Sequence, residues 1–326
     1  MKRMIMVVMA LSLAACAGVQ TGERTAGAPA IVLGMVAKSA DNPVFVAART
    51  GAEDAARVWA ERRGRTIRID WRTPPTENAA AQAAAVEALT VAKADGILVS
   101  CSDEGALTPR IDAAAANGIP VACFDADAPG SRRFAFVGID NRAAGAELAR
   151  QLVRAMDGAG VVAVLGGNRT APNLQERIAG VREELGRYPR MAVADVYYHV
   201  ETPAAAAATF MAEQRAHPEI EGWIMAGGWA LFAGAPVWLP GNDKVVAMDA
   251  LPEQLDALAS GRVQALVAQD CYQWGYRGVE LLLALILDGE LPDRAREMAT
   301  THTVTRDNLE QFRGQWQQWL RTGAAQ

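Results

Sequence analysis

The sequence has few of the residues that metal centres require. It contains only three histidines and four cysteines, and none of them recurs at the CxxC, CxxH or HExxH spacing of metal sites. No GxGxxG follows the first expected strand, and no GxxxxGK[ST] phosphate loop occurs anywhere. The sequence therefore predicts neither a metal site nor a cofactor.

The signatures of nucleophilic catalysis are missing as well. The chain has no GxSxG turn, which would hold an activated serine. Asp125 and Asp249 could form an acid–base pair, but nothing near either one in the sequence sets their roles apart. We expect no catalytic residues and no enzyme activity.

Positive charge is not in excess. The chain has 32 Lys and Arg against 37 Asp and Glu, a net charge of −5, and no basic block. Nucleic-acid binding depends on neutralising phosphates with such side chains, so we expect no nucleic-acid partner. Beyond the first residues there is no long apolar run, and we expect the rest of the chain to stay outside the membrane.

The first residues resemble a targeting signal. Lys2 and Arg3 precede an apolar run that ends at Ala15, which is shorter than the roughly 20 residues that span a bilayer and is typical of a secretory signal. Leu-Ala-Ala-Cys at residues 13–16 resembles the bacterial lipobox. This resemblance implies that Cys16 is lipidated and anchors the protein in the cell envelope or periplasm. An ordinary signal peptide and an uncleaved anchor remain alternatives.

Behind a signal peptide at 1–15 we expect a flexible tether at 16–28, because its residues are small and polar. The remainder alternates short β-branched runs with Ala-rich helical runs. Strands are expected at 31–37, 66–71, 96–101, 120–125, 134–139, 161–167, 191–198, 222–228, 244–250 and 263–270. Helices are expected at 45–63, 77–93, 105–117, 141–156, 173–186, 203–216, 252–260 and 272–288.

This alternation predicts an α/β fold of parallel sheets covered by helices on both faces. The strands are too many for a single sheet of this size, so two doubly wound lobes are expected. Cys101 and Cys123 both end predicted strands, which leaves a disulfide between them open. Ligands of parallel α/β sheets gather at the carboxyl ends of strands. The segments that follow these ends are 41–45, 102–103, 125–127, 168–177, 199–202, 228–229, 249 and 269.

Several of these segments resemble motifs of the type I periplasmic binding proteins, in the ribose/galactose-binding branch that serves ABC importers. The matching motifs, in order, are Asn42-Pro43-Val44-Phe45, Asp95-Gly96-Ile97-Leu98 with Ser102-Asp103, Ile119-Pro120-Val121 through Phe124-Asp125, Val137-Gly138-Ile139-Asp140-Asn141, Glu176-Arg177-Ile178-Ala179-Gly180, Met248-Asp249, and Ala268-Gln269-Asp270 with Tyr272 and Gly275. Their joint order extends from about residue 30 to about residue 310.

The resemblance implies two lobes joined by three crossovers, with the N-terminal lobe at 29–139 plus 270–297 and the C-terminal lobe at 140–269 plus 298–326. It further implies a monomer that closes on a small ligand, favouring a carbohydrate, and presents it to an ABC permease. The residues implied in binding are Phe45, Ser102, Asp103, Asp125, Asn141, Arg177, Asp249 and Gln269. Phe45 would stack on the ligand, and Asn141 would lie near the hinge.

The sequence also departs from the family pattern. Gly228-Trp229 replaces the usual Asn-Asp, and Pro236 interrupts the helix that should follow. Trp229 either contacts the ligand or packs in the core. We expect a wider and more apolar cleft, which leaves a larger glycoside or an apolar, sterol-like solute as alternatives to a small sugar. A sensor that signals to a membrane receptor is a further alternative.

Overall fold

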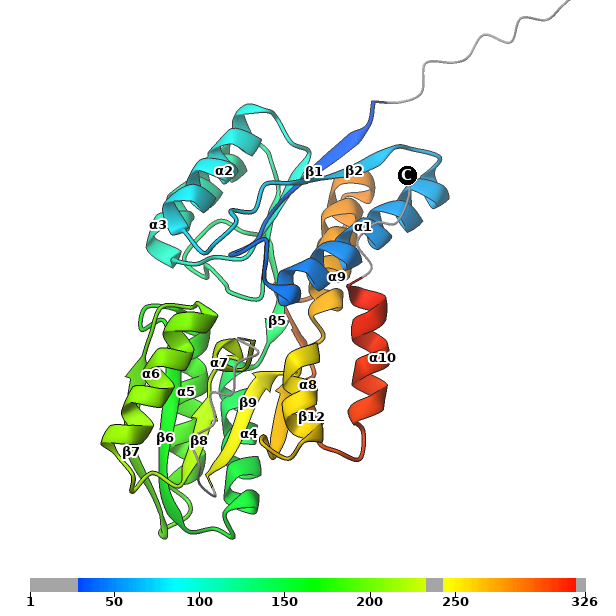
Figure 1. The fold of residues 1–326 in the computed structure, drawn as a ribbon. Helices are drawn as coiled ribbons and strands as arrows, with labels where there is room; N and C mark the ends of the chain where they lie inside the picture. Colours follow the sequence, from blue (N-terminus) through cyan, green and yellow to red (C-terminus); the bar gives the residue numbers. More distant parts are fainter. Residues whose placement is uncertain (1–28, 233–242, 321–326) are drawn as a thin grey trace, which may run out of the picture.

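The structure, a computed structural model, describes residues 29–232 and 243–320, which form two α/β lobes placed end to end (Figure 1). Cys16 and Pro236 lie outside the described residues. Within the described part, no helix combines the length and the apolar character needed to cross a membrane.

The N-terminal lobe is built on a six-stranded parallel sheet with the order β11-β5-β4-β3-β1-β2. Its strands are β1 (Ile31–Val36), β2 (Ile67–Trp71), β3 (Gly96–Val99), β4 (Val121–Phe124), β5 (Ala135–Ile139) and β11 (Arg296–Ala299). Its helices are α1 (Pro43–Arg63), α2 (Ala79–Val91), α3 (Glu104–Ala116) and α9 (Cys271–Asp288). The central strands β3 and β4 are buried along their whole length, as expected of a sheet covered on both faces.

The C-terminal lobe repeats this plan with the order β12-β10-β9-β8-β6-β7, in which only β12 is antiparallel to its neighbour. Its strands are β6 (Gly160–Gly167), β7 (Met191–Tyr198), β8 (Gly222–Met225), β9 (Lys244–Asp249), β10 (Ala265–Ala268) and β12 (His302–Val304). Its helices are α4 (Asn141–Ala155), α5 (Pro172–Leu185), α6 (Pro203–Ala216), α7 (Trp229–Phe232) and α8 (Pro252–Ala259). The expected fold class is confirmed.

Three segments cross between the lobes. The first two each lead into a helix capped by an aspartate: Asp140 accepts from the backbone N–H of Ala143 (2.9 Å), and Asp270 accepts from that of Gln273 (3.3 Å). The third crossover was expected between residues 297 and 298. It follows Ala299 instead, because β11 pairs with β5 through that residue before β12 joins the other sheet.

The last helix, α10 (Leu309–Trp319), was assigned by sequence to the C-terminal lobe but contacts both lobes (Figure 1). The indole N–H of Trp316 donates to the carbonyl of Ala250 in the C-terminal lobe (2.7 Å). Trp319 stacks on Tyr272 of α9 in the N-terminal lobe, with ring centroids 6.4 Å apart. The helix therefore bridges the two lobes on one side of the crossovers.

The three cysteines of the described residues are buried free thiols. Cys101 and Cys123 are close enough to share a hydrogen bond, which together with burial raises the pKa of Cys101. The two cysteines are therefore neighbours in the core of the N-terminal lobe and are not joined by a disulfide.

One pair of glycines in each lobe brings two helices into backbone contact. A Cβ added at Gly275 of α9 would lie 1.7 Å from the carbonyl oxygen of Ala48, and one at Gly51 of α1 would lie 2.0 Å from that of Tyr272. In the other lobe, a Cβ added at Gly145 of α4 would lie 1.9 Å from a carbonyl oxygen of α5, and one added at Gly180 of α5 would lie 2.0 Å from a carbonyl oxygen of α4. Each lobe is thereby fixed around one tightly packed helix pair.

Replacing Gly275 by alanine should separate α1 from α9, because backbone atoms cannot yield as a flexible side chain can. We expect the melting temperature to fall by roughly 3–10 °C. Gly314→Ala is the matched control, since no atom lies within 4 Å of its added Cβ and alanine favours the helix over glycine. Thermal unfolding followed by circular dichroism measures both. A Gly275→Ala protein as stable as the wild type would contradict this packing.

Candidate functional site

The carboxyl ends of both sheets meet at an inner cavity of about 40 Å³ between the lobes. It is lined by six of the residues singled out from the sequence: Phe45, Asp125, Arg177, Trp229, Asp249 and Gln269. The side chains that complete the lining are Lys38, Asn42, Val44, Asn173, Leu174 and Glu201. Residues far apart in sequence thus converge at one place.

A hydrogen-bonded chain centred on Arg177 forms one wall of this cavity. Its guanidinium, on a residue only 3% exposed, donates to Asn141 Oδ1 (2.8 Å), to the carbonyl of Ala226 (2.9 Å) and to Gln269 Oε1 (3.2 Å). Gln269 in turn donates from Nε2 to Asp249 Oδ1 (2.5 Å). Asn141 follows the first crossover and Gln269 precedes the second, so a single arginine connects the hinge to the cavity. Asn141 lies behind Arg177 and does not line either cavity.

Asp125 follows β4 and Asp249 is the last residue of β9, so the two lie at the end of the fourth strand along the chain in each lobe. Both have left-handed backbone, with φ of 57° and 92°, a conformation that is uncommon outside glycine and is concentrated at functional sites. Asp125 accepts from the hydroxyl of Ser100 (2.8 Å). Burial raises the pKa of Asp249, although Arg177 and Gln269 oppose the shift. These carboxyl groups can accept hydrogen bonds from hydroxyl groups of a ligand.

Two aromatic residues border the inner cavity. Phe45, near the start of α1, meets Phe124 edge-on at 6.2 Å between ring centroids. Trp229 begins α7 and lies against the backbone of Gly227 and Gly167, where an added Cβ would come within 2.2 and 2.9 Å of the indole. Helix α7 is described from Trp229 to Phe232, where the described residues stop, so the expected interruption of this helix at Pro236 stays a prediction.

A much larger chamber of about 1010 Å³ adjoins the inner cavity and extends to the mouth of the cleft. Ser102 and Asp103 line this outer chamber and not the inner cavity. Asp103 also caps α3, accepting from the backbone N–H of Ala106 (2.8 Å). The wall between the two spaces is formed by the residues that line both: Lys38, Asn42, Phe45, Glu201 and Trp229.

Lys38 and Glu201 place an ammonium group and a carboxyl group in this wall, one from each lobe. Lys38 is 4% exposed. Burial lowers its pKa, but the carboxylates of Glu201, Asp125 and Glu77 outweigh burial and raise it, so the ammonium keeps its charge. Burial raises the pKa of Glu201 to about 8; Lys38 opposes this shift, and a hydrogen bond shared with Glu77 of the other lobe supports it.

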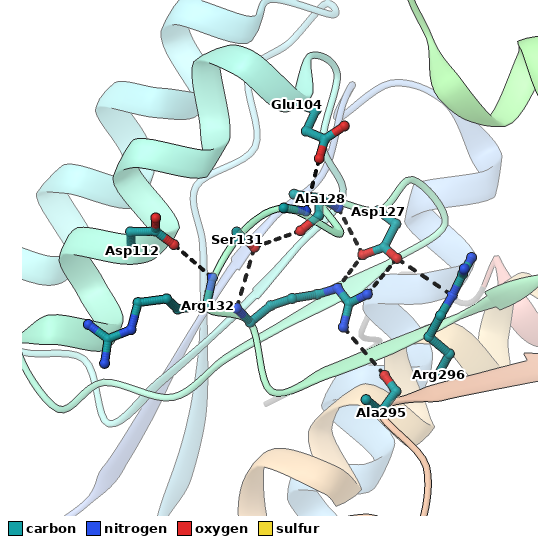
Figure 2. A network of polar contacts seen from close by, with 10 residues as sticks. Glu104, Asp112, Asp127, Ala128, Ser131, Arg132, Ala295 and Arg296 are labelled. Atoms are coloured by element: carbon teal, nitrogen blue, oxygen red, sulfur yellow. Dashed lines mark hydrogen bonds and ion pairs between the residues drawn. The ribbon is translucent and has the colours of Figure 1, made fainter.

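Asp127, in a strand-end segment singled out from the sequence, lines neither the inner cavity nor the outer chamber. Its carboxylate accepts from Arg133 through Nε and through a second nitrogen at 2.7 Å. Figure 2 shows Arg296 of β11 beside the same carboxylate, at 3.7 Å. Arg133 and Asp127 have side chains only 8% and 11% exposed. This ion pair, together with Arg296, connects the loop after β4 to the edge strand β11 and stabilises the fold.

Sequence reasoning missed Lys38 and Glu77. Lys38 follows the end of β1 and Glu77 lies in the loop after β2, so the rule of strand ends could have found Lys38. Glu77 gave no signal, because it lies several residues beyond its strand. Glu201 was in a singled-out segment but was not assigned to the site.

Replacing Glu201 by glutamine should remove a pH-dependent loss of stability. A pKa of about 8 against an ordinary 4.5 means that the folded protein binds a proton that the unfolded chain releases, so stability falls as the pH rises between these values. The variant should match the wild type near pH 5 and melt a few degrees higher near pH 9. Melting temperatures across this range measure the effect, with exposed Glu290→Gln as the control. Parallel profiles for wild type and Glu201→Gln would contradict the assignment.

Known proteins resemble this chain over most of its length. The D-ribose/D-allose-binding protein of Pseudomonas aeruginosa is 25% identical over 278 residues, which cover 81% of this chain and 85% of the relative. An ABC transporter solute-binding protein from Burkholderia graminis in complex with D-arabinose has a TM-score of 0.79 and 29% identity, covering 86% of this chain and 96% of that chain. An arabinose-binding protein from Geobacillus stearothermophilus has a TM-score of 0.72 and 27% identity, covering 87% and 99%.

The family assignment agrees with these relatives. Residues 33–291 match the family described as periplasmic binding protein domain, a span that includes the inner cavity and both of the first two crossovers. The resemblance noted from the strand-end motifs is confirmed. The chain belongs to the periplasmic binding protein family.

Proposed function

We propose that this protein captures a sugar between its lobes and delivers it to an ABC permease. The observation that carries the proposal is the polar chain of Asn141, Arg177, Gln269 and Asp249, which faces Asp125 and Phe45 of the other lobe. Carboxylates accept from sugar hydroxyls, a guanidinium donates to them, and an aromatic ring covers the C–H face of the sugar. The sugars named for the relatives support the same ligand class.

Binding requires the lobes to move. The inner cavity of about 40 Å³ has room for a few water molecules, each of which needs about 10–15 Å³, and is too small for a sugar ring. We infer that the lobes open about the three crossovers, admit the sugar beside Arg177 and close again, as in hinge closure of binding proteins. The closed form is the one that would dock on the permease.

The membrane anchor is the second part of the proposal. We infer that residues 1–15 are removed, that Cys16 takes the lipid and that residues 16–28 tether the lobes to the envelope membrane. The motif at residues 13–16 supports this. A protein held in this way would act as a monomer beside its permease.

Addition of the correct sugar should stabilise the protein. At a sugar concentration 100 times the dissociation constant, binding adds about 2.7 kcal/mol, a rise in melting temperature of roughly 5–10 °C for a chain of this size. A thermal-shift screen of aldopentoses and aldohexoses, with glycosides and sterols as comparison compounds, measures this. A rise with sterols alone would contradict the sugar assignment.

Asp249→Asn should then weaken sugar binding about 10- to 100-fold, because it removes a charged acceptor while keeping the shape of the side chain. Calorimetric titration with the sugar found in the screen measures the affinity. Asp256→Asn, on an exposed residue of α8, is the control. Equal affinities for wild type and Asp249→Asn would place the sugar elsewhere.

Lipidation can be followed directly. The full-length protein expressed in a Gram-negative host should incorporate an alkyne fatty acid and partition with membranes, and Cys16→Ser should lose both properties while still being exported. Labelling and fractionation of the two proteins measure this. A Cys16→Ser protein that remains labelled would contradict the anchor, and an unlabelled wild type found free in the periplasm would indicate plain secretion.

A further inference from the structure

The outer chamber of the cleft is far larger than the inner cavity and larger than a single sugar ring needs. Ligand pockets commonly have about 300–1,000 Å³, and the outer chamber, at about 1010 Å³, lies at the top of that range. It lies next to the proposed sugar position, because Lys38, Glu201 and Trp229 line both the chamber and the inner cavity. A ligand bound at Arg177 could therefore extend into the chamber.

Polar groups without partners are concentrated around the outer chamber. Ser102, on a residue 4% exposed, has a buried Oγ with no hydrogen-bond partner in the described part of the chain, and the same holds for His199 Nε2. Lys38 is equally buried, and the carboxyl groups of Glu201, Asp125 and Glu77 act on its ammonium charge. Ser102, His199 and Lys38 all line the chamber. Burying Ser102 Oγ and His199 Nε2 unpaired is costly, which indicates that a ligand completes them.

The roles of these groups can be assigned. His199 Nδ1 lies 2.8 Å from the carbonyl oxygen of Val200, so Nδ1 carries the hydrogen and Nε2 is an acceptor. Burial lowers the pKa of His199, which favours this neutral form. Lys38 is a donor only, and Ser102 can donate or accept. The chamber thus offers donors and acceptors together, and the hydroxyl group is the ligand group that satisfies both.

The chamber also has an aromatic side. Trp229 and Phe232 of α7, with Tyr198 at the end of β7, line it from the C-terminal lobe. His199 meets Trp229 edge-on at 5.6 Å between ring centroids, which holds the indole in place. Glu77 and Glu201 add carboxyl oxygens from opposite lobes. An aromatic surface bordered by hydroxyl-binding groups suits the two faces of a sugar ring.

We propose that the outer chamber is a second sugar subsite and that the physiological ligand is a glycoside of at least two rings. This proposal rests on the proposed function. One ring lies beside Arg177 and Asp249, and the next ring lies against Trp229, with its hydroxyls bonded to Lys38, Ser102 and His199. A monosaccharide fills only the first position.

The test compares each monosaccharide with disaccharides that contain it, by calorimetric titration of the mature chain. Suitable pairs are D-galactose with lactose and melibiose, and D-glucose with cellobiose and maltose, together with phenyl β-D-galactoside. We expect at least one disaccharide to bind 10-fold or more tightly than its monosaccharide. Equal affinities within every pair, or a phenyl glycoside as tight as the disaccharide, would overturn the second sugar subsite.

The variant His199→Phe keeps the ring contact with Trp229 and removes the acceptor Nε2. It should weaken the disaccharide roughly 3- to 10-fold and leave the monosaccharide within twofold, whereas Asp249→Asn should weaken both. An equal loss for both ligands in His199→Phe would contradict the subsite. Binding of monosaccharides alone would refute the second ring and keep the proposed function, and binding of no sugar at all would refute the proposed function itself.

Discussion

The buried guanidinium of Arg177 is the constraint on which the cleft depends. An arginine in a protein keeps its charge at any ordinary pH, so a residue only 3% exposed must be surrounded by acceptors. Asn141 beside the first crossover and Gln269 beside the second provide two of these acceptors. Gln269 in turn donates a hydrogen bond to Asp249. The polar wall of the cavity is therefore hydrogen-bonded to residues beside the crossovers. A ligand that contacts Arg177 or Asp249 is connected to the crossovers through these hydrogen bonds.

Close helix packing holds each lobe together internally. Each is fixed by helices in backbone contact, through Gly51 and Gly275 in one lobe and through Gly145 and Gly180 in the other. Gly145 packs on the carbonyl of Arg177 itself, so the helix that carries the arginine cannot shift within its lobe. The opening of the lobes that we propose would then take place at the crossovers and at α10, whose Trp316 and Trp319 contact opposite lobes.

The sequence predicted the larger part of this fold. Every expected strand and helix is present with its ends shifted by a few residues, because continuous apolar runs and clear N-caps mark them. Strands β11 and β12 were missed, since they are short edge strands with a single buried side chain between them, and so the third crossover was misplaced. In the cleft, strand-end reasoning and family motifs found Arg177, Asp249 and Gln269. They missed Lys38, although it follows the end of β1, and Glu77, which lies too far beyond β2 to give a local signal.

The central claim is that a sugar binds between the lobes against the Arg177 chain. A crystal structure of the mature protein grown with its highest-affinity sugar tests it most directly. The account predicts a sugar ring enclosed by both lobes, with hydroxyls bonded to Arg177 and Asp249 and one face on Phe45. A sugar bound on the outside of either lobe, with Arg177 bonded to protein atoms alone, would contradict the account.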